Sequence, residues 1–83
     1  MAEAHQNCGV ILAELGRLDE AIASYGEALR LRPDYAQAHY NLGNALLERR
    51  QFAEARAHFA AAVRLAPNFS AARDLLQQLE AAR

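Results

Sequence analysis

The sequence predicts an all-α protein, a solenoid of two helical hairpins followed by a C-terminal capping helix. Three observations support this prediction. The sequence repeats itself at an interval of 34 residues, Ala leads a composition rich in helix formers, and glycine or proline separates most of the segments with helical periodicity. With 83 residues, of which 53% are hydrophobic, the chain can form one small core and not two.

The repeat is visible when the sequence is aligned with itself after a shift of 34 residues. Residues 2–9 then fall on residues 36–43, and Pro33 falls on Pro67. Further matched pairs are Leu12 with Leu46, Ala21 with Ala55, Tyr25 with Phe59 and Ala28 with Ala62.

This interval divides the chain into a first repeat at residues 2–35, a second at 36–69 and one further helix at 70–83. A single hairpin cannot bury its own apolar face, so we expect the hairpins to stack and the last helix to cap the second one. The whole chain, residues 1–83, is therefore expected to form one domain.

The first hairpin has clear stop signals. Its first helix is expected at about Ala2–Leu15, where Gly16 ends it because glycine accepts a left-handed backbone. Its second helix is expected to begin at Asp19, whose carboxylate suits the unpaired N–H groups of a helix start. That helix runs to about Arg32, because Pro33 cannot continue it.

The second hairpin has the same plan, with helices expected at about Ala36–Arg49 and Phe52–Ala66. It lacks the turn glycine and has Arg50 at the equivalent position. The last helix is expected at about Ser70–Ala82, with Ser70 as its N-cap.

Apolar residues recur one turn apart in each hairpin, which places them on a shared face. Cys8, Leu12 and Leu15 are expected to face the core. Cys8 is interpreted as a small buried hydrophobe, since no base or oxyanion donor accompanies it as a nucleophile would require. The matching face of the second helix comprises Leu18, Ile22, Tyr25 and Leu29.

Composition argues against several classes of function. The net charge is −1, the pI is near 6.3 and every basic residue is Arg, scattered among acidic residues, so no basic nucleic-acid surface is expected. No apolar run approaches the ~18 residues of a membrane span, and the start lacks the pattern of a signal peptide. A lone cysteine implies no disulfide. We expect a cytoplasmic protein with no nucleic-acid or membrane partner.

The repeated pattern resembles a known family. The first unit has His5, Cys8, Gly9, Leu12, Ala21, Tyr25, Ala28 and Pro33 at the signature positions. The second has His39, Leu42, Gly43, Leu46, Ala55, Phe59, Ala62 and Pro67. Together they resemble the tetratricopeptide repeat, and residues 38–44 look most like the arrays that precede protein O-glycosyltransferase domains.

The resemblance implies a right-handed superhelix whose concave wall, built from the first helix of each repeat, holds a peptide or a partner helix. No catalytic domain fits in the chain, so we expect no enzyme and no cofactor. The side chains expected on this wall as peptide-binding residues are Gln6, Asn7, Val10, Gln37, Tyr40, Asn41, Asn44, Glu48, Asp74 and Gln78.

Asn7 and Asn41 are the most informative of these residues, because Asn is a poor helix former and recurs here in mid-helix. A carboxamide can pair with the backbone of any extended peptide, as the asparagine ladder of the resembled glycosyltransferase arrays does. Alternatively, the two residues cap or bridge the repeats internally. Tyr40 either contacts a ligand or stacks against the C-terminal helix.

Two other kinds of site are not expected. Tetratricopeptide cochaperones that grip a C-terminal carboxylate use Lys or Arg beside Asn, and only Asn41 matches that set here. His5 and His39 occupy equivalent places, but no further ligand completes a metal site, so both are interpreted as packing between helices. His58 is expected on the outer face, exposed to solvent.

We therefore predict a protein–protein interaction module that binds a peptide or partner segment on its concave face. The alternatives are a homo-oligomerising scaffold and a segment of a longer array of such repeats. The first alternative rests on the N-terminal end, where Val10 and Ile11 have no covering helix.

Overall fold

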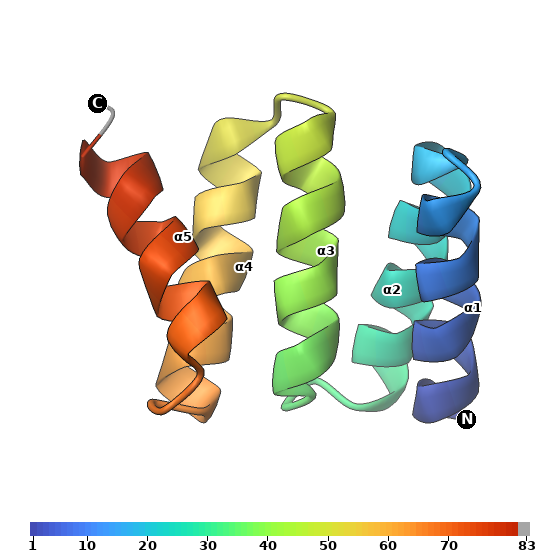
Figure 1. The fold of residues 1–83 in the computed structure, drawn as a ribbon. Helices are drawn as coiled ribbons and strands as arrows, with labels where there is room; N and C mark the ends of the chain where they lie inside the picture. Colours follow the sequence, from blue (N-terminus) through green and yellow to red (C-terminus); the bar gives the residue numbers. More distant parts are fainter. Residues whose placement is uncertain (82–83) are drawn as a thin grey trace.

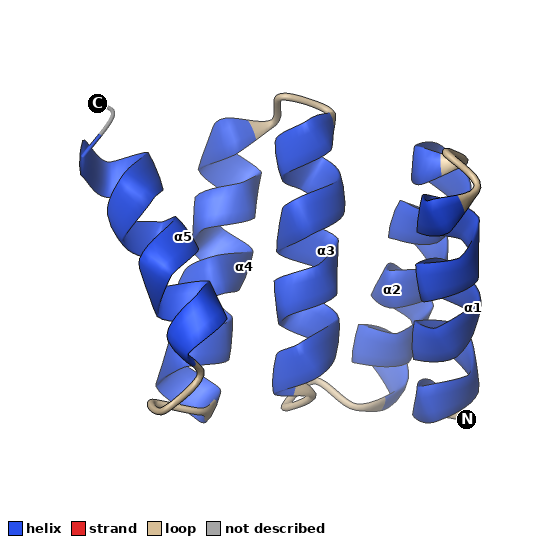
Figure 2. Ribbon diagram, in the orientation of Figure 1, coloured by secondary structure: helices blue, strands red, loops and turns tan. Residues whose placement is uncertain are grey.

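The computed structural model describes residues 1–81, and this part of the chain contains five α-helices and no strands (Figures 1 and 2). The predicted all-α hairpin architecture is confirmed. The helices are α1 (Ala2–Glu14), α2 (Leu18–Leu31), α3 (Ala36–Glu48), α4 (Phe52–Leu65) and α5 (Ser70–Ala81).

The helices form two layers. α1 packs against α2 and α3 packs against α4, each pair as an antiparallel hairpin. α2 also packs against α3, and α4 against α5, so the second helix of each hairpin contacts the next helix along the chain. Figure 1 shows α1, α3 and α5 along one side, with α2 and α4 behind them.

One expected helix start and one expected N-cap were wrong. Asp19 does not begin α2 but lies in its first turn, because the backbone N–H of Ala21 already bonds the carbonyl of Arg17. Ser70 is the first residue of α5 and not its N-cap, since the carbonyl that accepts from the Arg73 N–H belongs to Phe69. The expected end of the last helix at Ala82 lies outside the described residues.

The turns inside the two hairpins share one backbone conformation despite their different residues. Gly16 has φ of +79° and Arg50, at the equivalent position, has φ of +63°. The left-handed region costs an L-residue about 1–2 kcal/mol, which glycine avoids. The second hairpin therefore has the same turn conformation as the first, although it has Arg50 and not glycine at this position.

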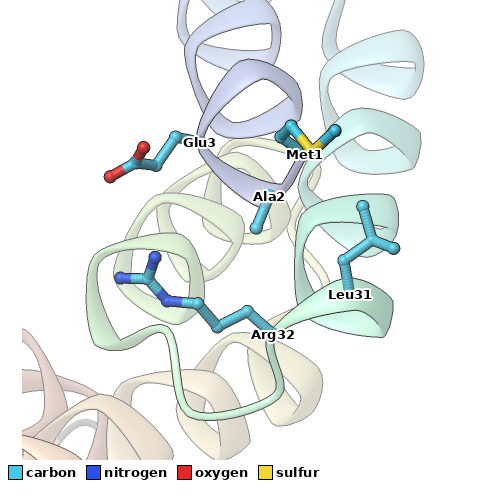
Figure 3. Close-up of a pocket in the computed structure, with 5 residues that line it drawn as sticks. All are labelled: Met1, Ala2, Glu3, Leu31 and Arg32. Atoms are coloured by element: carbon cyan, nitrogen blue, oxygen red, sulfur yellow. The ribbon is translucent and has the colours of Figure 1, made fainter.

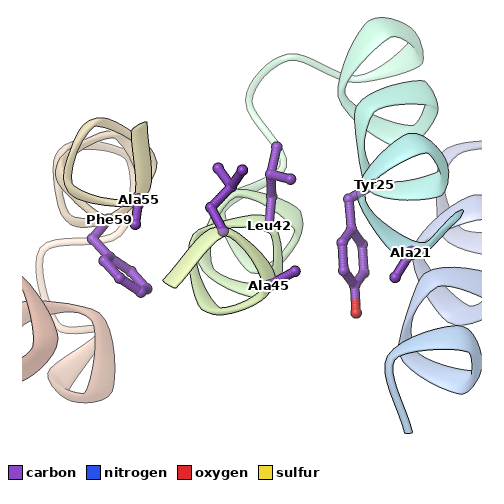
Figure 4. Close-up of a cluster of buried hydrophobic side chains, with 7 residues drawn as sticks. Ala21, Tyr25, Leu42, Ala45, Ala55 and Phe59 are labelled. Carbon is purple, nitrogen blue, oxygen red and sulfur yellow. The ribbon is translucent and has the colours of Figure 1, made fainter. Parts of the chain in front are cut away.

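The core is a continuous cluster that crosses both hairpins (Figure 4). Phe59 is its largest fully buried side chain, and Tyr25 fills the equivalent place in the first hairpin. Gly43 lets the Phe59 ring approach α3, because a Cβ on Gly43 would lie 2.8 Å from the ring carbon Cε1. The buried residues of the cluster are Ala21, Tyr25, Leu42, Ala45, Leu46, Ala55 and Phe59.

The predicted core face of α1 is only partly correct. Leu12 packs against the core, whereas Cys8 is exposed and Leu15 is 65% exposed. The equivalent of Cys8 in the second repeat, Leu42, is buried because α2 packs onto α3. In residues 1–81 no helix covers the corresponding side of α1, so Cys8 faces solvent.

Candidate functional site

The row formed by α1, α3 and α5 carries the ten predicted binding residues, and the structure divides them by exposure. Five lie on the exposed surface, and four are partly buried. One, Gln6, is buried. The exposed residues are Asn7, Gln37, Glu48, Asp74 and Gln78, and the partly buried residues are Val10, Tyr40, Asn41 and Asn44.

The two asparagines occupy equivalent positions on successive first helices. Asn7 is exposed, and Asn41 is half-buried. The Nε2 group of Gln37 donates a hydrogen bond of 3.3 Å to Oδ1 of Asn41, one turn further along α3. This bond uses Oδ1 as an acceptor, and the Nδ2 group of Asn41 has no hydrogen-bond partner among the described residues and can donate to a ligand. The bond lies within one helix, so it does not bridge the repeats.

Gln6 and Tyr40 are also equivalent positions, and both turn toward the interior. Gln6 is 6% exposed, and its Oε1 atom has no hydrogen-bond partner in the protein. The ring of Tyr40 lies 4.8 Å from that of Phe69 and 5.9 Å from that of Phe59, measured between centroids. Tyr40 thus packs, with tilted rings, against α4 and against the residue before α5, and not against the C-terminal helix itself as the packing alternative had it.

His39 and His58, which the sequence analysis placed on different faces, contact each other in the structure. His58 was expected on the outer face, exposed to solvent, and that expectation is wrong. It is half-buried, with its Nδ1 atom 3.0 Å from Nδ1 of His39. The signal in the sequence was weak, because the first repeat has Ser24 where the second has His58.

The start and the free side of α1 expose several large apolar side chains. Met1 is 87% exposed, Ile11 58% and Leu15 65%. A pocket of about 490 Å³ lies at the edge of this surface, between the start of α1 and the end of α2 (Figure 3). Its lining residues are Met1, Ala2, Glu3, Leu31 and Arg32.

Residues 1–81 lack the features of two other kinds of site. No group of three or more His, Cys, Asp or Glu side chains in this part of the chain is arranged to hold a metal ion. None of the described helices combines the length and the apolar character needed to cross a membrane.

Two family models match the chain. A model of the TPR repeat matches residues 9–49, and a second, of the tetratricopeptide repeat, matches residues 36–69. No curated protein gives a significant match.

Among solved structures, the chain is similar to YrrB, described as a TPR protein with an unusual peptide-binding site. The TM-score is 0.89 at 26% identity, and the match covers 95% of this chain but only 41% of YrrB. A second similar structure is the first TPR of Spaghetti (RPAP3) bound to the HSP90 peptide SRMEEVD. Its TM-score is 0.63 at 19% identity, over 98% of this chain and 91% of that one, which supports the fold alone.

Proposed function

The chain belongs to the tetratricopeptide repeat family, and from that premise we propose that it binds a peptide or partner segment along the row of α1, α3 and α5. The observation that supports this most directly is the pair Asn7 and Asn41, which places a carboxamide on the first helix of each repeat. Two similar folds, YrrB and the Spaghetti domain, are described as peptide binders.

The chemistry of the row favours backbone recognition. Asn7 offers a free donor and acceptor, and Asn41 offers the Nδ2 donor that Gln37 leaves available. Spaced one repeat apart, such groups pair with peptide amides of any sequence, as in the asparagine ladder of the glycosyltransferase arrays that the sequence resembles. The partner is accordingly bound as an extended segment.

The charges of the ten site residues indicate which kind of peptide they would bind. Glu48 and Asp74 are exposed carboxylates, and none of the ten site residues is basic. A peptide rich in carboxylates, or one held by its C-terminal carboxylate, would find no cation among these residues. We propose a neutral or basic segment as the partner.

The test is titration of the full chain against fluorescently labelled extended peptides of neutral, basic and acidic composition. Replacing both Asn7 and Asn41 by Ala is expected to weaken binding of the preferred peptide by about 5- to 150-fold, since each lost hydrogen bond contributes about 0.5–1.5 kcal/mol. Asn68→Ala is the matched control, because Asn68 is exposed in the loop before α5. Equal affinity for the double variant and the control, with the helical circular dichroism unchanged, would refute the asparagine ladder.

The exposed side of α1 favours a second candidate function, self-association. Ile11 and Leu15 lie one turn apart on the surface that, at the equivalent side of α3, is covered by α2. A mass measured by light scattering that rises with protein concentration, and returns to the monomer value in Ile11→Glu, is the expected outcome for this function. A monomeric mass at every concentration would exclude it.

A further inference from the structure

His39 and His58 make a direct contact between the two helices of the second repeat. Their Nδ1 atoms are 3.0 Å apart, and the ring centroids are 5.2 Å apart with an interplanar angle of 29°. The two nitrogens are therefore at the distance of an N–H···N hydrogen bond. His39 is on α3 and His58 on α4, so this bond joins the hairpin across its width.

A third contact decides which nitrogen carries the proton. Nε2 of His39 lies 3.0 Å from the carbonyl oxygen of Pro33, in the loop between α2 and α3. A carbonyl oxygen only accepts, so Nε2 of His39 donates. In the neutral ring Nδ1 of His39 is then an acceptor, and Nδ1 of His58 donates to it. The bonds thus run from His58 through His39 to Pro33.

This arrangement holds one additional proton but not two. If Nε2 of His58 is protonated, both hydrogen bonds remain, with His58 still the donor. If the second ring is protonated as well, two N–H groups meet head to head at 3.0 Å and two positive charges lie side by side. The doubly protonated pair has to separate.

The surroundings make protonation costly. Burial lowers the pKa of His58 most, the charge of His39 lowers it further, and only the carboxylate of Glu54, one turn earlier on α4, raises it. The α2–α3 loop presents the Pro33 carbonyl to His39, while the Arg32 guanidinium of that loop lies over the Tyr35 ring.

The charged groups on the other elements packed on this hairpin are not among the causes of the lowered pKa of His58. On α2, Glu27 and Arg30 pair with each other. On α5, Arg73 and Asp74 are exposed. Asp34, in the α2–α3 loop, is also exposed. The pKa of His58 is therefore set by its burial, by His39 and by Glu54.

We propose that His39 and His58 form an acid-sensitive latch, which ties α3, α4 and the loop between the two hairpins together near neutral pH and opens in mildly acidic solution. The first repeat has no such latch, because its equivalent positions are His5 and Ser24. Opening loosens the second hairpin and its junction with the first, since Pro33 belongs to that junction.

The direction of the pH effect is set by linkage. The closed pair takes up one proton, on His58 and at a lowered pKa, and has to open to take up a second, so it binds fewer protons than two unfolded histidines do. The stability it supports is complete above the unfolded pKa of about 6.5 and falls as the pH drops below that value toward the folded pKa. Each unit of depression shifts the folding equilibrium about tenfold.

The test compares urea unfolding of the full chain at pH 7.5 and pH 5.0 for the unmodified protein and for His58→Ser, the residue that the first repeat has at this position. The unmodified midpoint is expected to fall on acidification, and the fall is expected to be smaller in His58→Ser. His5→Gln is the matched control and should keep the full decrease. Protonation of carboxylates is common to all three proteins and cancels in the comparison.

A measurement on the unmodified protein avoids dependence on whether a variant folds. Long-range ¹H–¹⁵N spectra of the imidazoles are expected to show His39 protonated at Nε2, and His58 titrating below its ordinary range. An Nδ1-protonated neutral His39, or an ordinary titration of His58, would overturn the proposal. So would an equal loss of midpoint in His58→Ser and the unmodified chain.

Discussion

The two repeats have nearly the same pattern of residues but very different burial. Cys8 on α1 is exposed, whereas its equivalent Leu42 on α3 is 6% exposed. Ile11 is 58% exposed, whereas its equivalent Ala45 is 3% exposed. The difference arises because α2 packs onto α3, and no described helix packs onto the same side of α1. A repeat position is thus buried by its neighbours in the stack, not by its own hairpin.

At two pairs of equivalent positions, the two repeats also differ in how well the residue suits its backbone. At the turn, the first repeat has Gly16 where the second has Arg50 in the same left-handed conformation. In the middle of the second helix, the first repeat has Gly26 where the second has Ala60. Each repeat therefore has one residue that suits its backbone conformation less well than the equivalent residue of the other repeat.

The largest expected effect concerns the core. Leu42→Ala should lower the free energy of unfolding by about 2–5 kcal/mol, because it removes a buried side chain and leaves a cavity. Cys8→Ala, at the equivalent but exposed position, should change it by less than about 0.5 kcal/mol. Urea unfolding of both variants measures the difference. Similar losses in the two variants would mean that Cys8 is covered in solution, as self-association predicts.

A smaller effect, of opposite sign, is expected at the turn of the second repeat. Arg50→Gly should stabilise the chain by about 1 kcal/mol, because glycine adopts a φ of +63° without the penalty of a side chain. The reciprocal change, Gly16→Ala, should destabilise it. Thermal unfolding followed by circular dichroism provides the measurement. A lower melting temperature for Arg50→Gly would show that contacts of the Arg50 side chain outweigh its backbone strain.

The smallest expected effect is at Gly26. This glycine is exposed inside α2, and a Cβ added there would meet no atom within 4 Å. Gly26→Ala should therefore stabilise the protein by roughly 0.5–1 kcal/mol through helix propensity alone. Ala60→Gly is the reciprocal control and should destabilise by a comparable amount. If Gly26→Ala instead weakens the fold, a close neighbour in solution, such as a second copy, is indicated.

Much of the fold could be predicted from the sequence, because its signals are local. The expected helices agree with α1–α5 to within about one residue at most ends. The stops at Gly16 and before Pro33 are set by backbone conformation, which depends on the residue itself. The start of α2 was missed by one residue and the N-cap assigned to Ser70 was wrong, since a capping side chain is a preference that the backbone can do without.

The candidate site was less predictable, because spacing along a helix does not show what fills the groove beside it. Gln6 and Tyr40 were placed on the binding wall with Asn7 and Asn41, yet both turn toward neighbouring elements. Whether the remaining wall residues bind a peptide stays a prediction. The contact of His39 with His58 joins residues that no local pattern relates.

By itself the sequence determined five helices, the breaks between them and the pairing of helices into hairpins. These depend on helical periodicity, turn residues and the 34-residue repeat, all of which act over short stretches of chain. The tertiary structure alone decided that Leu42 is buried and Cys8 exposed, that Tyr40 packs on Phe69, and that two histidines come within hydrogen-bond distance. The physical reason is that burial and side-chain contact depend on which helix lies alongside, and equivalent positions in a stack have different neighbours.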